Sequence, residues 1–264
     1  MRSLKFIHKN NEPCCFLSFP SLIGIYLKNM PNLEGWWESR VEGETLPIFP
    51  QLQYLRLQRC PKLSSMPKIA STRQVTVILR DVSVQVVSAI IGPLLNFHEI
   101  RLEEIKDLKD LEMEFHQNQN PNLGSSSSSM SSQSLTRLRV LKIEKCSNLM
   151  SLPEWIGTIT SLWDLKIIDC PKLKSLPEGM RQLKSLNWLT IKGCPQLQER
   201  CKEGGEDWPN IAHILFKRFT EIGAVETAEI AEIGIWRKIK DFIPNVRSSL
   251  TCGYEHSLNY KPTL

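Results

Sequence analysis

The sequence has little that is typical of a secreted or membrane-spanning protein. Its first residues, MRSLKFIHKNNEP, turn polar before an apolar segment of about 7 to 15 residues can form, so we expect no secretory leader. The longest mainly apolar run without a charge, residues 82–97, includes Pro93 and is shorter than the roughly 20 residues of a spanning helix. Asn-x-Ser/Thr glycosylation sites are absent as well. These absences predict a cytoplasmic protein without a membrane span.

Motifs of catalysis and nucleotide binding are also missing. No Gly-x-Ser-x-Gly or His-Glu-x-x-His motif accompanies the scattered histidines. No Gly-x-x-x-x-Gly-Lys-Ser/Thr loop is present to hold phosphates. Glu206 and Asp207 beside Gly204 and Gly205 could form a carboxylate site, but turn and cap residues are the simpler interpretation. We expect no enzyme activity and no cofactor.

The charge balance does not favour a nucleic-acid partner. The chain carries 33 basic and 28 acidic side chains, so its net charge of +5 is a mild excess. No Lys/Arg cluster of the kind that follows a phosphate backbone is present. We therefore expect no nucleic-acid binding.

The chain instead contains a repeated apolar frame, Leu-x-x-Leu-x-Leu-x-x-Cys-x-x-Leu, in which other apolar residues replace some positions. The last three copies are 24 residues apart, and a weaker copy around Val75 and Val77 would fill the longer gap in the middle. Clear copies begin at Leu22, Leu52, Phe97, Leu138, Leu162 and Leu186. Self-similarity at such a period indicates an array of stacked units rather than an ordinary globular domain.

Each copy predicts one coil of a larger structure. The Leu-x-Leu segment alternates apolar and polar residues, so Leu165 and Ile167 would point inward from a short strand. The Cys-Pro that follows predicts a corner, because a residue before proline avoids the helical region. Leu-Pro-Glu at 152–154 and 176–178 predicts a short helical return. The predicted fold is an α/β solenoid, a horseshoe with a parallel β-sheet on its concave face and an irregular or short helical convex side.

The cysteines follow the same frame. Cys146, Cys170 and Cys194 occupy one repeat position, and no Cys-x-x-Cys pair typical of zinc sites is present. A disulfide framework or a metal site is therefore disfavoured against small buried thiols in a reducing compartment.

Four phrases carry a resemblance to a known family. They are FPSLIGIYLKNMPNLEGWWE from Phe19, FPQLQYLRLQRCPKLSSMP from Phe49, LTRLRVLKIEKCSNLMSLPEWIGTITSLWDLKIIDCPKLKSLPEGM from Leu135 and CPQLQERCKEGGEDWPNIAHI from Cys194. They resemble the leucine-rich repeats of plant intracellular nucleotide-binding, leucine-rich-repeat (NLR) disease resistance proteins of the coiled-coil-type subgroup. The last phrase is similar to the one that closes the repeat domain in that family. The resemblance covers residues 15–214.

The resemblance suggests how the chain is organised. Residues 1–20 would be a broken or partial first repeat, and residues 21–214 an array of about six to seven repeats with a Ser-rich insertion at 119–134. That insertion is interpreted as a disordered rim segment or a phosphorylated switch. Residues 215–264 would form a C-terminal extension, with a helix at about 220–243 that caps the array or lies on a membrane surface, followed by a disordered tail.

Family members place a nucleotide-binding domain before the repeats, and its phosphate loop is missing here. The chain therefore resembles the C-terminal part of such a receptor, as a fragment, a truncated gene or a free-standing repeat protein. It is not expected to bind ADP or ATP by itself.

The outward strand positions are the candidate partner-binding residues on the concave face, where aromatic and Arg side chains supply anchors and alternating charges supply selectivity. Trp188 is the favoured position, although it could pack against the tail helix instead, and a merely solvated face is the alternative for the others. The predicted set is Tyr26, Lys28, Tyr54, Arg56, Gln58, Glu99, Arg101, Glu103, Lys142, Glu144, Asp164, Lys166, Trp188 and Lys192.

By resemblance, the partners would be proteins: a pathogen effector, a guarded host protein, or the nucleotide-binding domain in cis or in trans. The implied function is a protein-protein interaction module of a plant immune receptor in the defence response. The alternative is a free-standing repeat adaptor, for example the substrate-recognition part of a ubiquitin ligase, although residues 1–20 resemble no docking motif for that role. An extracellular receptor ectodomain would need a leader, glycosylation sites and a spanning segment.

Overall fold

The computed structural model describes residues 4–8, 19–37, 49–67, 69, 71–91, 97–109 and 137–220. All of these residues belong to one compact unit, Met1–Ile222. The predicted Ser-rich insertion at 119–134 lies outside the described residues. The helix predicted at about 220–243 also lies outside them, except for Thr220, which belongs to a strand.

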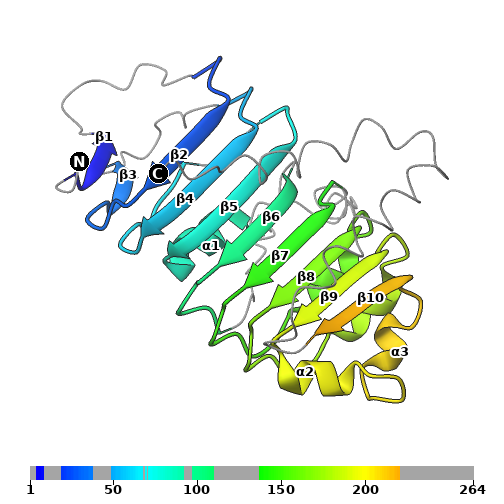
Figure 1. Ribbon diagram of the computed structural model, residues 1–264. Helices are drawn as coiled ribbons and strands as arrows, with labels where there is room; N and C mark the ends of the chain where they lie inside the picture. Colours follow the sequence, from blue (N-terminus) through cyan, green and yellow to red (C-terminus); the bar gives the residue numbers. More distant parts are fainter. Residues whose placement is uncertain are drawn as a thin grey trace, which may run out of the picture. The chain divides into compact units, whose positions relative to one another are not determined.

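Eight parallel strands form one sheet in the order β2-β4-β5-β6-β7-β8-β9-β10 (Figure 1). Their bounds are β2 (Gly24–Lys28), β4 (Tyr54–Cys60), β5 (Val75–Val82), β6 (Phe97–Glu103), β7 (Val140–Glu144), β8 (Asp164–Ile168), β9 (Trp188–Lys192) and β10 (Phe216–Thr220). A separate parallel pair joins β1 (Phe6–His8) to β3 (Gly35–Trp37). The stacked parallel strands confirm the predicted α/β solenoid.

The apolar frame forms a continuous core on one face of the sheet. Equivalent frame positions pair directly across neighbouring strands and are all buried: Leu55, Val77, Ile100, Leu141, Leu165 and Leu189. The weak copy around Val75 and Val77 is therefore a full strand, β5, in register with its neighbours. This copy was difficult to identify from the sequence because Val replaces Leu at several frame positions.

Each coil turns its corner through a residue in the left-handed backbone region. The residue four positions after the buried column Ile25, Leu55, Val77, Ile100, Leu141, Leu165 and Leu189 has a positive φ in every coil from β2 to β9: Asn29, Arg59, Asp81, Glu104, Lys145, Asp169 and Gly193. Proline was expected to set this corner, but Val82, Ile105 and Cys146 follow such residues with no proline after them. The left-handed residue makes the corner, with or without proline.

Corner amides extend the sheet beyond the strands. The N–H of Lys145 donates to the carbonyl of Ile168 at 2.8 Å, and the N–H of Asp169 donates to the carbonyl of Lys192 at 2.7 Å. These bonds give the corner amides partners on the next coil, which offsets part of the cost of the left-handed conformation in successive coils.

Short helices and irregular segments form the return of each coil. Two 3₁₀ helices, η1 (Glu154–Thr158) and η2 (Glu178–Gln182), begin directly after Pro153 and Pro177, as the two Leu-Pro-Glu motifs predict. The Glu154 carboxylate accepts hydrogen bonds from the N–H groups of Glu178 and Gly179, at 3.3 and 3.1 Å. It therefore stabilises the positive end of the next coil's helix rather than that of its own.

The longest described helix is α1 (Val84–Ile91), which buries Val86, Val87, Ile90 and Ile91. It occupies the apolar run noted in the sequence and packs that run into the core. No helix within the described ranges has the length and apolarity to cross a bilayer.

A polar cap closes the C-terminal end of the core. Helices α2 (Pro195–Arg200) and α3 (Trp208–Ile211) precede β10, which adds a strand that the sequence did not predict. Asp207 is 3% exposed, accepts the N–H of Leu176 at 2.9 Å and pairs with Arg200 at 2.9 Å. A Cβ on Gly205 would lie 2.3 Å from the carbonyl oxygen of Arg200, so this tight turn requires glycine. The geometry agrees with the interpretation of Asp207 as a cap residue.

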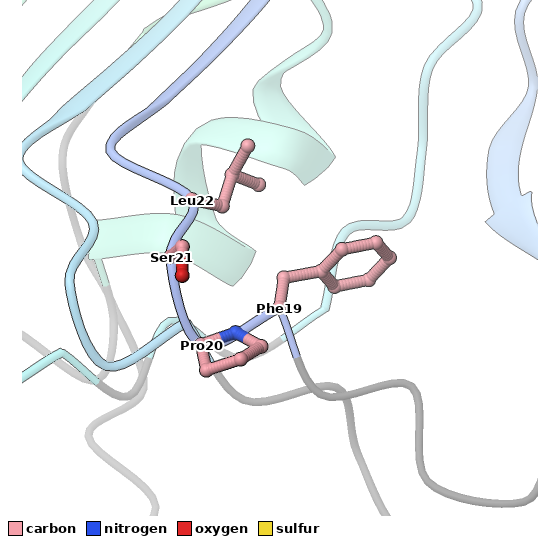
Figure 2. A pocket seen from close by; sticks show the side chains of 4 residues that line it. All are labelled: Phe19, Pro20, Ser21 and Leu22. Atoms are coloured by element: carbon pink, nitrogen blue, oxygen red, sulfur yellow. The ribbon is translucent and has the colours of Figure 1, made fainter.

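The N-terminal end of the sheet is less completely covered. Leu22 and Leu27 are half-buried, whereas the equivalent Leu162 and Ile167 are completely buried. An open pocket of about 380 Å³ is lined by consecutive residues of the segment before β2, Phe19 to Leu22 (Figure 2). Among the described residues, β2 is an edge strand of the eight-stranded sheet, and on the side away from β4 only the short β1 pairs with its coil, through β3.

This difference predicts unequal effects of the same substitution at two equivalent positions. Leu162→Ala should lower the free energy of unfolding by about 2 to 5 kcal/mol, as expected for a fully buried leucine. Leu22→Ala should cost about half as much or less, because less apolar surface leaves water there on folding. Urea denaturation of both variants measures the difference, and equal losses would show that Leu22 is as well covered as Leu162.

The cap gives a second prediction. Asp207→Ala should lower the free energy of unfolding by about 1.5 to 3 kcal/mol, because the buried N–H of Leu176 loses a charged acceptor. Glu206→Ala is the matched control, since Glu206 also pairs with Arg200 but is exposed. Thermal or urea denaturation should show little change in the control. A similar loss in both variants would contradict the role assigned to Asp207.

Candidate functional site

The face of the sheet opposite the core presents three rows of side chains that cross all eight strands. The first row comprises Gly24, Tyr54, Thr76, Glu99, Val140, Asp164, Trp188 and Phe216. The middle row comprises Tyr26, Arg56, Ile78, Arg101, Lys142, Lys166, Thr190 and Arg218. The third row comprises Lys28, Gln58, Arg80, Glu103, Glu144, Ile168, Lys192 and Thr220. We call this surface the outer face.

All of the predicted partner-binding residues lie on the outer face, because strand alternation places them opposite the buried leucines. The structure thus brings the set together on one surface. Whether they contact a partner stays a prediction.

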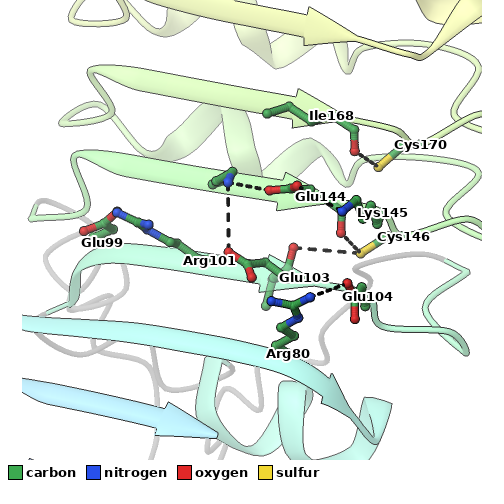
Figure 3. A network of polar contacts seen from close by, with 12 residues as sticks. Arg80, Glu99, Arg101, Glu103, Glu104, Glu144, Lys145, Cys146, Ile168 and Cys170 are labelled. Carbon is green, nitrogen blue, oxygen red and sulfur yellow. Dashed lines mark hydrogen bonds and ion pairs between the residues drawn. The ribbon is translucent and has the colours of Figure 1, made fainter. Parts of the chain in front are cut away.

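In the centre of the outer face, cations of the middle row pair with carboxylates of their own strand. Arg101 binds Glu99 at 2.5 Å, and Lys166 binds Asp164 at 3.2 Å. Lys142 pairs with Glu144 and lies 4.0 Å from Glu103. Both of these carboxylates are labelled in Figure 3. A spacing of two residues puts both partners of each pair on the same face of the strand. These charges are therefore already balanced within the protein.

Arg80 on β5 is also paired, but with a corner residue. Its guanidinium donates to Glu104 at 2.7 Å (Figure 3). This hydrogen bond holds the pKa of the Glu104 carboxyl below its usual value and raises the pKa of Arg80. The pair fixes the corner of the β6 coil against β5.

The C-terminal end of the outer face is aromatic. The rings of Trp188 on β9 and Phe216 on β10 stack with centroids 4.2 Å apart and planes inclined by 15°. Trp188 was the favoured predicted contact, with packing against a tail helix as the alternative. The structure shows Trp188 stacked on a strand residue, Phe216, which remains exposed. The tail helix of the alternative lies outside the described residues. The two rings form one aromatic surface.

The N-terminal end of the outer face carries two tyrosines beside cations. Tyr26 is 62% exposed and Tyr54 is 39% exposed. A Cβ on Gly24 would lie 2.4 Å from Cε2 of Tyr26, so the Tyr26 ring lies over Gly24 in the space that its missing side chain leaves. Arg56, next to Tyr26 in the middle row, is exposed and makes no ion pair with a described residue.

Two strands contribute no residue to the predicted set, although each carries outer-face residues. On β5 these are Thr76, Ile78 and Arg80, which the period-two pattern of VTVILRDV could have revealed without any leucine frame. On β10 they are Phe216, Arg218 and Thr220. Phe216 follows its partner Trp188 by 28 residues rather than 24, because the cap helices intervene, so a search at the repeat period passes over it.

Two of the buried cysteines, Cys170 and Cys201, are poor candidates for chemistry. Cys60, Cys146, Cys170, Cys194 and Cys201 are buried free thiols. The contact with the Cys146 thiol, together with burial, raises the pKa of Cys170 to about 12, and burial raises the pKa of Cys201 to about 12. A thiol that stays protonated at neutral pH is a poor nucleophile and a poor metal ligand, which describes Cys170 and Cys201. The contact with the Cys170 thiol lowers the pKa of Cys146, which is completely buried. Among the described residues, no group of His, Cys, Asp and Glu is arranged to hold a metal ion.

Comparison with known proteins connects this architecture to a repeat family. A family model described as R13L1/DRL21 leucine-rich repeats matches residues 94–194, which cover the coils of β6 to β9. No curated protein matches the chain significantly. The family match and the parallel sheet support a leucine-rich-repeat module for protein interaction.

The Arg80–Glu104 pair predicts a pH-dependent contribution to stability. Because the folded-state pKa of Glu104 is lowered, its contribution is present above the unfolded-state pKa and is lost as pH falls through the folded-state pKa. Glu104→Gln should lower the free energy of unfolding at neutral pH by less than about 1 kcal/mol, since the pair is partly exposed. Urea denaturation at several pH values should show that the difference from wild type disappears in acid. A difference that persists unchanged in acid would contradict this assignment.

Proposed function

We propose that this chain is the protein-interaction module of a plant immune receptor of the NLR type. In this role its outer face binds a pathogen effector, a guarded host protein, or the receptor's nucleotide-binding domain. The observation that carries the proposal is the outer face itself, a surface of aromatic and charged side chains held in rows by a repeat scaffold. The match to the R13L1/DRL21 repeats supports the same role.

The mechanism follows from the way the scaffold holds these side chains. Each outer-face residue is fixed by a strand whose inward neighbours are buried, so a partner meets a surface that needs little ordering on binding. The nucleotide-binding domain and a pathogen protein would compete if they contact overlapping parts of that surface. A pathogen protein that binds the active state of the receptor more tightly than the inactive state would then shift the population toward the active state. The module then signals by exchange of partners, without chemistry of its own.

An intracellular location fits this proposal. The five described cysteines are buried and unpaired, and Cys146, Cys170 and Cys194 repeat at one position of successive coils. Free thiols in such a series are typical of a reducing compartment. A partner would therefore be an intracellular protein, including an effector delivered into the cell.

A quantitative pull-down tests the proposed function. The full chain would be immobilised and incubated with plant leaf extract, and bound proteins compared between wild type and a Trp188→Ala, Arg56→Glu double variant. The matched control is Met150→Lys, which changes an exposed apolar residue outside the strands. We expect the double variant to capture at least about tenfold less of a defined set of proteins, because it loses two interface anchors. The control variant should capture the same proteins as wild type. Unchanged capture of every protein by the double variant would exclude the outer face as the binding surface.

A further inference from the structure

Among the described residues, charged side chains are ion-paired in the centre of the outer face but not at its N-terminal end. This difference between the two regions indicates the chemistry of a partner. On β6, β7 and β8 it carries four carboxylates, Glu99, Glu103, Glu144 and Asp164, against three cations, Arg101, Lys142 and Lys166. Each of these cations already binds a carboxylate. A partner contacting the centre would have to compete with ion pairs inside the protein.

The β2 and β4 strands differ from the centre in two ways. Their outward residues are Gly24, Tyr26, Lys28, Tyr54, Arg56 and Gln58, a set that includes two cations and no carboxylate. Lys28 and Arg56 are exposed and make no ion pair with a described residue. We call Tyr26, Lys28, Tyr54 and Arg56 the β2–β4 patch.

We propose that the β2–β4 patch binds a partner-protein segment in which carboxylate side chains alternate with apolar or aromatic ones. This inference rests on the proposed function and names the chemistry of its partner. The Arg56 guanidinium offers a planar set of donors that suits a carboxylate, and the exposed tyrosine rings offer apolar surface with a polar end. The patch thus combines the residue types that dominate protein interfaces.

Register fixes how these groups face a ligand. Tyr26 and Arg56 are direct neighbours in the middle row, and Tyr54 is next to Gly24 in the first row. Because the Tyr26 ring lies over Gly24, it extends toward the first row, where Tyr54 is the neighbour of Gly24. With neighbouring strands about 4.8 Å apart, a single extended segment can reach the rings and the guanidinium together.

A nucleic acid fits this patch less well than an acidic protein segment. Tyrosines and cations also stack bases and bind phosphates, but tight binding of a nucleic acid needs several phosphate contacts along a positive path. Beyond the patch such a path would meet Glu99, Glu103 and Glu104 on and beside β6. Those carboxylates repel a continuous polyanion, whereas a short acidic segment can end before them.

Fluorescence anisotropy with defined probes tests the proposal on the full chain. The first probe is a labelled synthetic peptide in which Glu alternates with Leu and Tyr. The second is the same peptide with Lys in place of Glu, and the third is a labelled oligouridine. We expect the acidic peptide to bind, to weaken as salt is raised, and to bind at least about tenfold more tightly than either other probe.

Variants locate the binding surface. Arg56→Glu and Tyr26→Ala should each weaken the acidic peptide by about tenfold, the effect of losing an anchor. Lys166→Glu makes the same charge change at a middle-row residue that is already paired, and should change affinity by less than about twofold. Gly24→Ala keeps every patch side chain but displaces the Tyr26 ring, so it should also weaken binding. Circular dichroism and thermal denaturation confirm that each variant is folded.

Several results would overturn the inference: no binding of the acidic peptide, equal binding of the Lys peptide, tighter binding of oligouridine, or equal losses from Arg56→Glu and Lys166→Glu. Pull-downs with the two single variants, Trp188→Ala and Arg56→Glu, separate this failure from failure of the proposed function. If Trp188→Ala alone loses proteins that Arg56→Glu keeps, the outer face binds partners but the β2–β4 patch does not. If neither variant loses any protein, the proposed function itself is wrong.

Discussion

The in-register pairing of eight parallel strands is the constraint on which the core, the corners and the outer face all depend. Because side chains alternate along a strand, a shift of one residue in any pair would expose its leucines and bury its charges. The same register lets corner amides such as those of Lys145 and Asp169 donate to the next strand. Each coil is therefore folded by its neighbours. The half-buried Leu22 shows how a coil differs when its strand lies at the edge of the sheet.

The sequence was sufficient to predict the coils whose leucines keep the frame, since Leu141, Leu165 and Leu189 occupy one buried column. It was less informative where other forces decide. Proline was taken as the origin of the corner, yet Lys145 and Glu104 adopt the left-handed conformation with no proline after them. That conformation is selected by hydrogen bonds to the next coil, and local sequence does not reveal them.

The position of the candidate surface could be predicted from the sequence, but the contacts among its side chains could not. Alternation alone placed Arg56, Lys142 and Trp188 on one face, because it depends only on strand geometry. The ion pairs of the centre and the stacking of Trp188 on Phe216 depend on side-chain conformations and on a strand that lies off the repeat period. The sequence was therefore sufficient to predict the surface. The structure shows that this surface has a centre in which every cation is ion-paired and an aromatic group at each end.

The rows of the outer face have a further consequence. Every coil contributes one residue to each row, so adding or removing a whole coil between β6 and β9 would leave all rows aligned. Such a change would move the two aromatic ends apart or together by about 4.8 Å per coil and alter neither of them. Duplication or deletion of 24-residue units would therefore set the distance between the two aromatic ends in steps of one coil. It gives evolution a way to match the reach of this surface to targets of different size.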